Sequence, residues 1–454
     1  MAEPVALAVA ARGPRVPALL RQTAFRRYWS AQTVSLFGDQ VTMLALPLLA
    51  ALSIGAGPTE MGYLTAAALL PNLFFSLPAG AWADRHPRKR HLMIVADLGR
   101  AGLLLAVPLL WWANALTLPL LYAVAFATGT LAVVFEVAHS SLFAALVARP
   151  DYVRANSLIN GSRALSYVAG PSLGGLLVQL ISAPFALVAD VLSYLASAAW
   201  LSRTPVTEQP VQHARGLGMA AGMRFVARSP LLRAMLLAST TLNLFNYIFA
   251  ALFVLYATTE LRLTPGTLGL IIGAGAVGGL LGAAVTGPIS RRIGIGPALL
   301  LGLVAFPAPL ILVPLAGGSP RQVLTLLFAA EFVSALGVML LDITSGSVQT
   351  AATPPSMLAV VAGFKRTVNY GVRPLGAVIG GTLGAALGLR PTLWIASVGA
   401  LLGVVWVLFS PLRTMQRLPE PDHRHGVLGE AADDQGAVAF GDGGDEAVPA
   451  VRAA

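Results

Sequence analysis

Ionisable side chains inside long apolar stretches are the residues of this sequence best suited to chemistry. Asp39, Glu331 and Arg373 each lie within a run of mostly apolar residues. In a bilayer such a group is costly unless it is paired or hydrated, so each is a functional candidate. Asp39 lies near the middle of its run, where burial favours the neutral form of a carboxylate. It is therefore either a proton-coupling site or a structural carboxylate hydrogen-bonded between helices.

Other polar residues of these runs are candidates for contact with a bound molecule. The Arg373 guanidinium can pair with an anionic substrate group or with Asp39. Glu331 and Asp190 either line a cavity or form hydrogen bonds in helix packing. Asn246 lies near the position of Asp39 in the second half of the chain, but it cannot titrate.

A third set of charges lies near one end of the apolar runs. Its members are Asp97, Arg100, Glu136 and Arg163 in the first half and Asp342, Lys365 and Arg366 in the second. Opposite charges at repeated positions predict ion pairs. Such pairs either form a conformational gate that breaks and re-forms, or anchor the helix ends permanently.

Several kinds of chemistry are missing from the sequence. There is no cysteine, which excludes disulfides and cysteine metal sites. There is no phosphate-binding Gly-Lys-Ser loop and no zinc-protease spacing of histidines. We therefore expect no enzyme, no cofactor and no metal site. A chain of this kind must draw on an existing gradient, and protons suit carboxylates inside a bilayer.

The composition predicts the elements that must position these residues. Of the 454 residues, 56% are hydrophobic and 11% are charged, unlike a soluble globular protein. A helix needs about 20 mostly apolar residues to cross a bilayer. We predict an all-α membrane protein with about twelve transmembrane helices, at 32–54, 61–83, 92–113, 117–139, 155–181, 184–201, 234–257, 267–289, 298–316, 322–346, 358–387 and 392–410.

The arginines predict the orientation of these helices. One set of connections, together with both chain ends, carries most of the basic residues, whereas the opposite set carries Arg262, Arg321 and Arg390. An excess of positive charge marks the cytoplasmic side, so both termini are expected there. The net charge of +10 is explained by these loops, and no nucleic acid partner is expected. We predict a multi-pass protein of the bacterial inner membrane.

Two halves of the chain repeat at an offset near 205 residues. Gly62 and Gly80 recur as Gly269 and Gly287, and Glu136 recurs as Asp342. Repeated helix bundles usually enclose a central path and rock around it to give alternating access. The predicted division is a cytoplasmic segment 1–28, a six-helix bundle 29–201, a cytoplasmic linker 202–230, a second six-helix bundle 231–411 and a disordered tail 412–454.

The stretch Gly80-Ala-Trp-Ala-Asp84-Arg85-His-Pro87-Arg88-Lys resembles the signature loop of the major facilitator superfamily. Pro87 replaces a glycine of that signature, and the second copy of the loop has Arg291 in place of the aspartate. The resemblance implies that Gly80, Asp84, Arg85 and Arg88 take part in conformational switching. The alternative is a solvated loop that only orients the protein.

A second motif resembles the exporters of that superfamily. It consists of Gly161, Gly170, Pro171, Gly174 and Gly175, with Ser166 in place of one further glycine. The stretches Phe25–Trp29 and Ser35–Gln40 are similar to the branch that contains the enterobactin exporter and the macrolide efflux proteins. These likenesses imply export rather than uptake.

Together these patterns predict a secondary active transporter that exports amphipathic small molecules, such as drugs or siderophore-like metabolites. We expect a monomer that works by alternating access with proton antiport. One alternative is a lipid flippase or an uptake carrier of the same fold. An alternative of another class is a receptor or scaffold that does not transport.

Overall fold

The computed structural model describes residues 18–85, 88–206 and 219–418, with the backbone alone over residues 77–85. Throughout these residues the regular structure is helical, without a β-strand. The predicted all-α fold is therefore confirmed. Most of the predicted tail, much of the predicted N-terminal segment and part of the predicted linker lie outside the described residues.

The first half of the chain forms one long helix for each predicted crossing. These helices are α2 (Thr23–Leu48), continued by the π-helical η1 (Leu49–Ile54), then α3 (Pro58–Arg85), α4 (Lys89–Trp112), α5 (Leu118–Leu146), α6 (Tyr152–Ile181) and α7 (Ala183–Ser202). Two short pieces, α1 (Ala18–Arg21) and the 3-10 turn η2 (Arg149–Asp151), precede α2 and α6. Most of these helices extend a few residues beyond the predicted apolar stretches.

The second half repeats this order with two broken crossings. Its elements are α8 (Met219–Arg228), α9 (Pro230–Thr259), α10 (Pro265–Ile293), α11 (Ile295–Ala305), η3 (Ala308–Ile311), α12 (Leu312–Leu315), α13 (Pro320–Ala351), α14 (Leu358–Leu387), α15 (Leu389–Ala400), α16 (Gly403–Leu408) and η4 (Pro411–Thr414). The crossing predicted at 298–316 is interrupted where Pro307 and Pro309 remove two backbone donors.

Ten helical segments of the described chain are long and apolar enough to cross a membrane. The two further predicted crossings correspond to α3 and α14. The helix α14 has 30 residues, but Lys365, Arg366 and Arg373 lower its apolar character. The count of twelve crossings and the cytoplasmic position of both termini stay predictions.

Local sequence signals explain where the helices of the second half begin. Ser229, Thr264 and Ser319 each precede a proline at the first helical position of α9, α10 and α13. Each hydroxyl accepts a hydrogen bond from a backbone N–H of the first turn. This combination satisfies a free donor and presets the helical φ angle.

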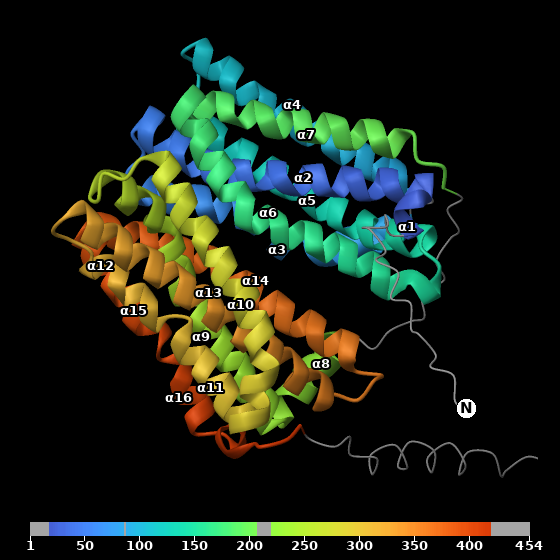
Figure 1. Ribbon diagram of the computed structural model, residues 1–454, viewed down its shortest axis with the longest axis vertical. Helices are drawn as coiled ribbons and strands as arrows, with labels where there is room; N and C mark the ends of the chain where they lie inside the picture. Colours follow the sequence, from blue (N-terminus) through green and yellow to red (C-terminus); the bar gives the residue numbers. More distant parts are fainter. Residues whose placement is uncertain (1–17, 86–87, 207–218, 419–454) are drawn as a thin grey trace, which may run out of the picture.

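The long helices form two bundles that repeat each other (Figure 1). In the first, α2 packs on α6 and α7, and α5 packs on α3 and α4. In the second, α9 packs on α14 and α15, and α13 packs on α10 and α11. The helix α14 begins and ends 206 residues after α6. The two halves therefore share one arrangement of helices.

Two close helix crossings join the bundles, α6 with α10 and α3 with α14. At the first, a methyl group on Gly269 would lie 3.1 Å from the Cα of Gly175. At the second, a methyl group on Gly62 would lie 2.9 Å from the Cα of Gly381. Both crossings lie at the helix ends predicted to face the outside. Toward the opposite end the bundles diverge (Figure 1).

The close crossing of α6 and α10 predicts a specific disulfide. A Cβ at Gly273 would lie 3.8 Å from the Cβ of Ser172, which matches the spacing in a disulfide, given a small shift away from the Val168 carbonyl. We expect the pair Ser172→Cys with Gly273→Cys to cross-link under mild oxidation. Electrophoretic mobility with and without a reductant would measure it, and the native chain contributes no background thiol.

The control for this cross-link is the pair Ser140→Cys with Gly363→Cys. These two residues line the open space between the bundles from α5 and α14. They should cross-link much more slowly. Equal rates for the two pairs would contradict the arrangement in which only one end is closed.

Candidate functional site

A central cavity of about 640 Å³ lies between the two bundles. Its walls come from α2, α3, α5 and α6 of the first bundle and from α14 of the second. Three charged residues line it, Glu136, Arg163 and Arg366, together with Tyr167 and Tyr370. The wall is thus a mixture of aromatic, aliphatic and charged groups, which suits an amphipathic molecule.

The predicted gate charges of this cavity are separated. In the described part of the chain no ion pair joins Glu136 to Arg163, and the Arg366 guanidinium lies over the Tyr370 ring, 5.2 Å from its centroid. The repeat of 206 residues places Asn369, not Arg366, at the position equivalent to Arg163. Arg366 therefore lies about one helical turn before the position equivalent to Arg163. The three charges nevertheless share one cavity.

The second-half charges that were expected to pair are also apart. Lys365 Nζ donates a hydrogen bond to Gln349 Oε1 at 3.0 Å. Asp342 forms no ion pair with Lys365 or Arg373 among the described residues. Pairing at these positions stays a prediction for another state of the protein.

A buried ionic cluster lies inside the first bundle, where α2, α4 and α7 meet. Arg100 Nη2 donates to Asp97 Oδ1 at 2.5 Å, and Arg100 Nη1 lies 3.6 Å from Asp39 Oδ1. The Tyr194 hydroxyl donates to the same Asp39 oxygen at 2.5 Å. The side chains of Asp97 and Arg100 are 0% and 4% exposed, whereas that of Asp39 is 39% exposed.

The exposed fractions of these side chains distinguish Asp39 from Asp97 and Arg100, which the sequence had placed among the gate charges. Asp97 and Arg100 lie in the bundle interior and do not line the central cavity. Their geometry favours the alternative of a permanent ion pair over a gate. Asp39 is the accessible carboxylate of the cluster, and Leu36, one turn earlier on α2, lines the central cavity.

Aromatic rings complete the surroundings of Arg100. Its guanidinium carbon lies 4.6 Å from the Phe135 ring centroid and 4.2 Å from that of Tyr194. Such cation–π contacts stabilise a desolvated guanidinium. Sequence reasoning missed Tyr194, although its position four residues after Asp190 places both on one face of α7.

Asp190 is a packing residue, as the plainer interpretation of its sequence position proposed. Its carboxyl group accepts hydrogen bonds from the Thr42 and Ser193 hydroxyls and is fully buried. Gly38 of α2 is in contact with Asp190 and Ser193, so any side chain there would collide with them. The absence of a side chain at Gly38 lets α2 and α7 close over this carboxyl group.

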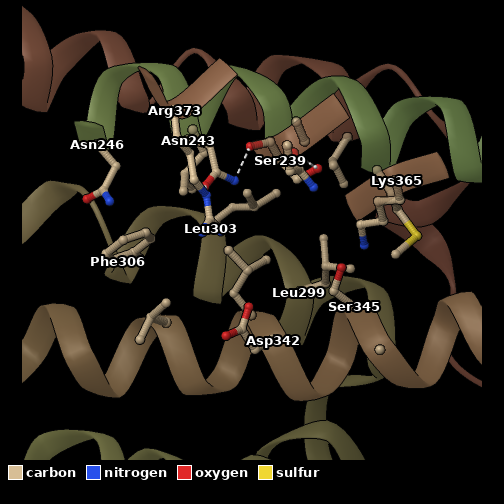
Figure 2. Close-up of a pocket in the computed structure, with 18 of the residues that line it drawn as sticks. Ser239, Asn243, Asn246, Leu299, Leu303, Phe306, Asp342, Ser345, Lys365 and Arg373 are labelled. Carbon is tan, nitrogen blue, oxygen red and sulfur yellow. Dashed lines mark hydrogen bonds between the residues drawn. The ribbon is translucent and has the colours of Figure 1, made fainter. Parts of the chain in front are cut away.

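The second bundle contains a separate cavity of about 370 Å³, shown in Figure 2. Arg373 and Asn246, both predicted site residues, line it together with Asp342 and Lys365. Arg373 Nε donates to Asn243 Oδ1 at 2.9 Å. Asp39 is bound instead by Arg100 and Tyr194 of its own bundle, so the structure does not bring Arg373 and Asp39 into contact.

Two further predicted residues, Glu331 and Arg88, are not among the residues that line either cavity. Glu331 packs against Gly275 where α13 crosses α10. Arg88 is exposed directly before α4. Gly80, Asp84 and Arg85 belong to the stretch of α3 that is described by its backbone alone, so their contacts lie outside the description. Among the residues that the structure does describe, no group of three metal-binding side chains is found.

The exporter motif forms the surfaces by which α6 packs on two other helices. Gly170 and Gly174 face Gln40 and Val41 of α2. Gly175 and the Pro171 carbonyl face Gly269 and its neighbours on α10. Gly161 faces open space. The motif includes the letters Gly-x-Ser-x-Gly, but Ser172 lies in a continuous helix and not on the strand-to-helix turn of a hydrolase.

Residues 16–438 match the family described as transmembrane secretion effector. The chain belongs to this family of the major facilitator superfamily. This secretion effector homologue is thus a multi-pass membrane transporter. Its relatives are transporters rather than enzymes.

Bacterial proteins are among the curated relatives of this chain. It is 28% identical over 406 residues to the multidrug efflux pump Tap of Mycobacterium tuberculosis, covering 85% of this chain and 93% of that protein. It is 26% identical over 233 residues to the class C tetracycline resistance protein of Escherichia coli, covering 50% of this chain and 56% of that protein.

Solved structures share the fold. A bacterial homologue of the iron transporter ferroportin, in an inward-facing state, has a TM-score of 0.69 at 17% identity, covering 86% of this chain and 99% of its own. The nucleoside transporter NupG has a TM-score of 0.66 at 11% identity, covering 85% of this chain and 98% of its own. At such identities the likeness concerns the fold alone.

The exporter motif contains its own matched pair of test positions. Gly170→Ala would drive a methyl group against the Gln40 side chain and should lower the free energy of unfolding by roughly 1–3 kcal/mol. Gly161→Ala meets nothing and should be neutral or stabilising by up to about 1 kcal/mol. Thermal unfolding in detergent would measure both. Equal losses at the two positions would argue against the packing described for α6.

The buried ion pair predicts strong coupling between its members. Arg100→Gln leaves Asp97 buried without its cation and should destabilise the protein by about 3–5 kcal/mol. The double variant Asp97→Asn with Arg100→Gln should recover part of this loss. Thermal unfolding of the two single variants and the double variant would give the coupling energy. Simply additive losses would mean that the pair contributes no specific interaction.

Proposed function

We propose that this protein exports amphipathic small molecules from the cytoplasm by alternating access, in exchange for protons. The observation that carries this proposal is the central cavity between two bundles whose close crossings, in the described part of the chain, lie at one end. With the predicted orientation, the open end faces the cytoplasm. A substrate would therefore enter from inside the cell and leave after the bundles rock to the opposite arrangement.

The contacts at the closed end support this motion. Between the bundles, the crossings α6 with α10 and α3 with α14 are built on glycines and backbone carbonyls. At these glycines no side chains interlock between the helices, so a rocking motion there need only part the apolar residues of the two bundles that pack beside them. At the open end, Glu136, Arg163 and Arg366 are separated and available to pair when that end closes.

Asp39 is the proposed proton carrier. Its carboxylate is partly exposed and is held by Tyr194 and by the edge of Arg100, which is itself bound to Asp97. Protonation of Asp39 would remove its attraction for Arg100 and leave the Arg100–Asp97 pair intact. Proton binding could thus release α2 from α4 without leaving an unpaired charge in the bundle.

The proposed substrate class follows from the cavity wall and from the relatives. The wall combines two arginines and one glutamate with Tyr167, Tyr370 and aliphatic groups. The relatives carry the names multidrug efflux pump and tetracycline resistance protein. We propose multi-ring drugs with polar groups as substrates. We also propose that the protein is a monomer in the bacterial inner membrane.

Other functions remain as outcomes of experiment. A lipid flippase or an uptake carrier would use the same cavity but a different substrate or direction. A receptor or scaffold would have no need of the accessible carboxylate at Asp39. No observation on the described residues favours these functions over export.

Asp39→Asn should abolish the exchange of drug for protons. In everted membrane vesicles with an acidified lumen, addition of tetracycline to vesicles with the native protein should release protons, read from a pH-sensitive dye. The Asp39→Asn variant should reduce this release by roughly tenfold or more. Tetracycline uptake into the same vesicles should fall in parallel.

The matched control is Glu260→Gln. Glu260 is also a half-exposed carboxylate near an arginine, 3.7 Å from Arg390 at the predicted outer end. Its neutralisation should leave the exchange close to that of the native protein. Undiminished proton release by Asp39→Asn would refute Asp39 as the carrier, and release without any drug uptake would refute antiport.

A further inference from the structure

The cavity inside the second bundle is separate from the central cavity, and α14 is the wall between them. Lys365, Asn369 and Arg373 recur every four residues and face the inner cavity. Arg366 and Tyr370 face the central cavity. Because residues four apart share one side of a helix, α14 presents a different charged stripe to each space.

The inner cavity has an apolar wall of its own. Leu299 and Leu303 of α11, Phe306, Leu341 of α13 and Val407 of α16 contribute it. Figure 2 shows Leu299, Leu303 and Phe306 on one side of the space and Arg373, Asn243 and Asn246 on another. A bound molecule would meet an aliphatic and aromatic surface opposite a polar one.

The polar wall is positively charged. The Arg373 guanidinium carbon lies 4.5 Å from the Tyr370 ring centroid and 5.2 Å from that of Tyr247, which fixes its plane. Arg373 has no carboxylate within 4.0 Å in the described part of the chain, and Lys365 binds only the neutral amide of Gln349. Two cations therefore face this cavity without an ion-pair partner.

One acidic residue of the described chain lines the cavity, and it lies at the mouth. Asp342 and Gly346 line the cavity and also line an open groove on the surface of α13. Both residues are exposed. The charge along the walls is thus +2 in the interior and −1 at the entrance, which favours an anion that has passed inside.

We propose that this inner cavity is a binding site for amphipathic organic anions. A carboxylate of the ligand would accept hydrogen bonds from the Arg373 guanidinium, whose planar fork suits that group. The apolar body of the ligand would pack against Leu299, Leu303 and Phe306. The site does not depend on the proposed export, because binding requires neither a gradient nor a conformational cycle.

Titration calorimetry of the purified full-length protein in detergent tests this site. The probe is 2-naphthoate, and the control is 2-naphthamide, which has the same shape without the charge. We expect naphthoate to bind at least about tenfold more tightly than the amide. Equal affinity for the two probes would overturn the proposal.

Variants locate the binding in the inner cavity. Arg373→Gln should weaken naphthoate about tenfold or more, Arg373→Lys should be intermediate, and Asp342→Asn should strengthen it a few-fold. Arg366 lies about two turns earlier on the same helix and lines the central cavity but not the inner one, so Arg366→Gln should change the affinity less than about twofold. If Arg366→Gln weakens binding as much as Arg373→Gln, the anion binds in the central cavity and the proposal fails.

One further variant keeps the test decisive if the charge variants fold poorly. Leu303→Trp extends an indole ring into the space proposed for the apolar body of the ligand and leaves every charge in place. It should weaken naphthoate binding markedly. Retained binding in a folded Leu303→Trp protein, as judged by thermal unfolding, would refute the site whatever the other variants do.

Discussion

The architecture depends on how closely the helix backbones of the two bundles approach each other. At Gly175 with Gly269, and at Gly62 with Gly381, no side chain separates the helices. A bilayer supplies no hydrophobic drive between helices, so close packing of small residues must hold the bundles together. Because this packing occurs at one end, the opposite end is left to form a cavity. The position of the glycines along α3, α6, α10 and α14 thereby sets which side of the protein is open.

The two bundles share helix order but differ in what fills them. In the first bundle, Arg100, Phe135 and Tyr194 form a packed cluster around an ion pair. The residues 206 positions later are Phe306, Leu341 and Ala400. Two of these line the cavity of the second bundle, and the third is too small to replace a tyrosine. The first bundle thus contains a buried ion pair in a packed interior, whereas the second contains a cavity lined by charged side chains. The two halves therefore share a backbone arrangement but differ in the side chains of their interiors.

Much of the helix plan could be predicted, because apolar length and basic loops are set by the bilayer itself. Of the exporter glycines, only Gly175 lies at a close crossing between the bundles, whereas Gly170 and Gly174 pack on α2 and Gly161 meets nothing. The partners of the charged residues could not be predicted, because periodicity does not say which neighbouring helix a side chain faces. Asp97 and Arg100 looked like gate residues yet lie in a bundle interior. Arg373 looked like a partner of Asp39 yet faces Asn243. Tyr194 was overlooked because a single aromatic residue in an apolar run has no distinctive pattern.

The helix α14 is shared by both cavities, and this has a thermodynamic consequence. Tyr370 lines the central cavity, and its ring centroid lies 4.5 Å from the guanidinium carbon of Arg373, which lines the inner cavity. A molecule that drew Arg373 away from this ring would alter a wall of the central cavity. Occupancy of one space would then change the affinity of the other, and linkage requires the effect to be equal in both directions. Helix α14 would thus couple the two cavities, so that the concentration of one solute would affect the binding of another.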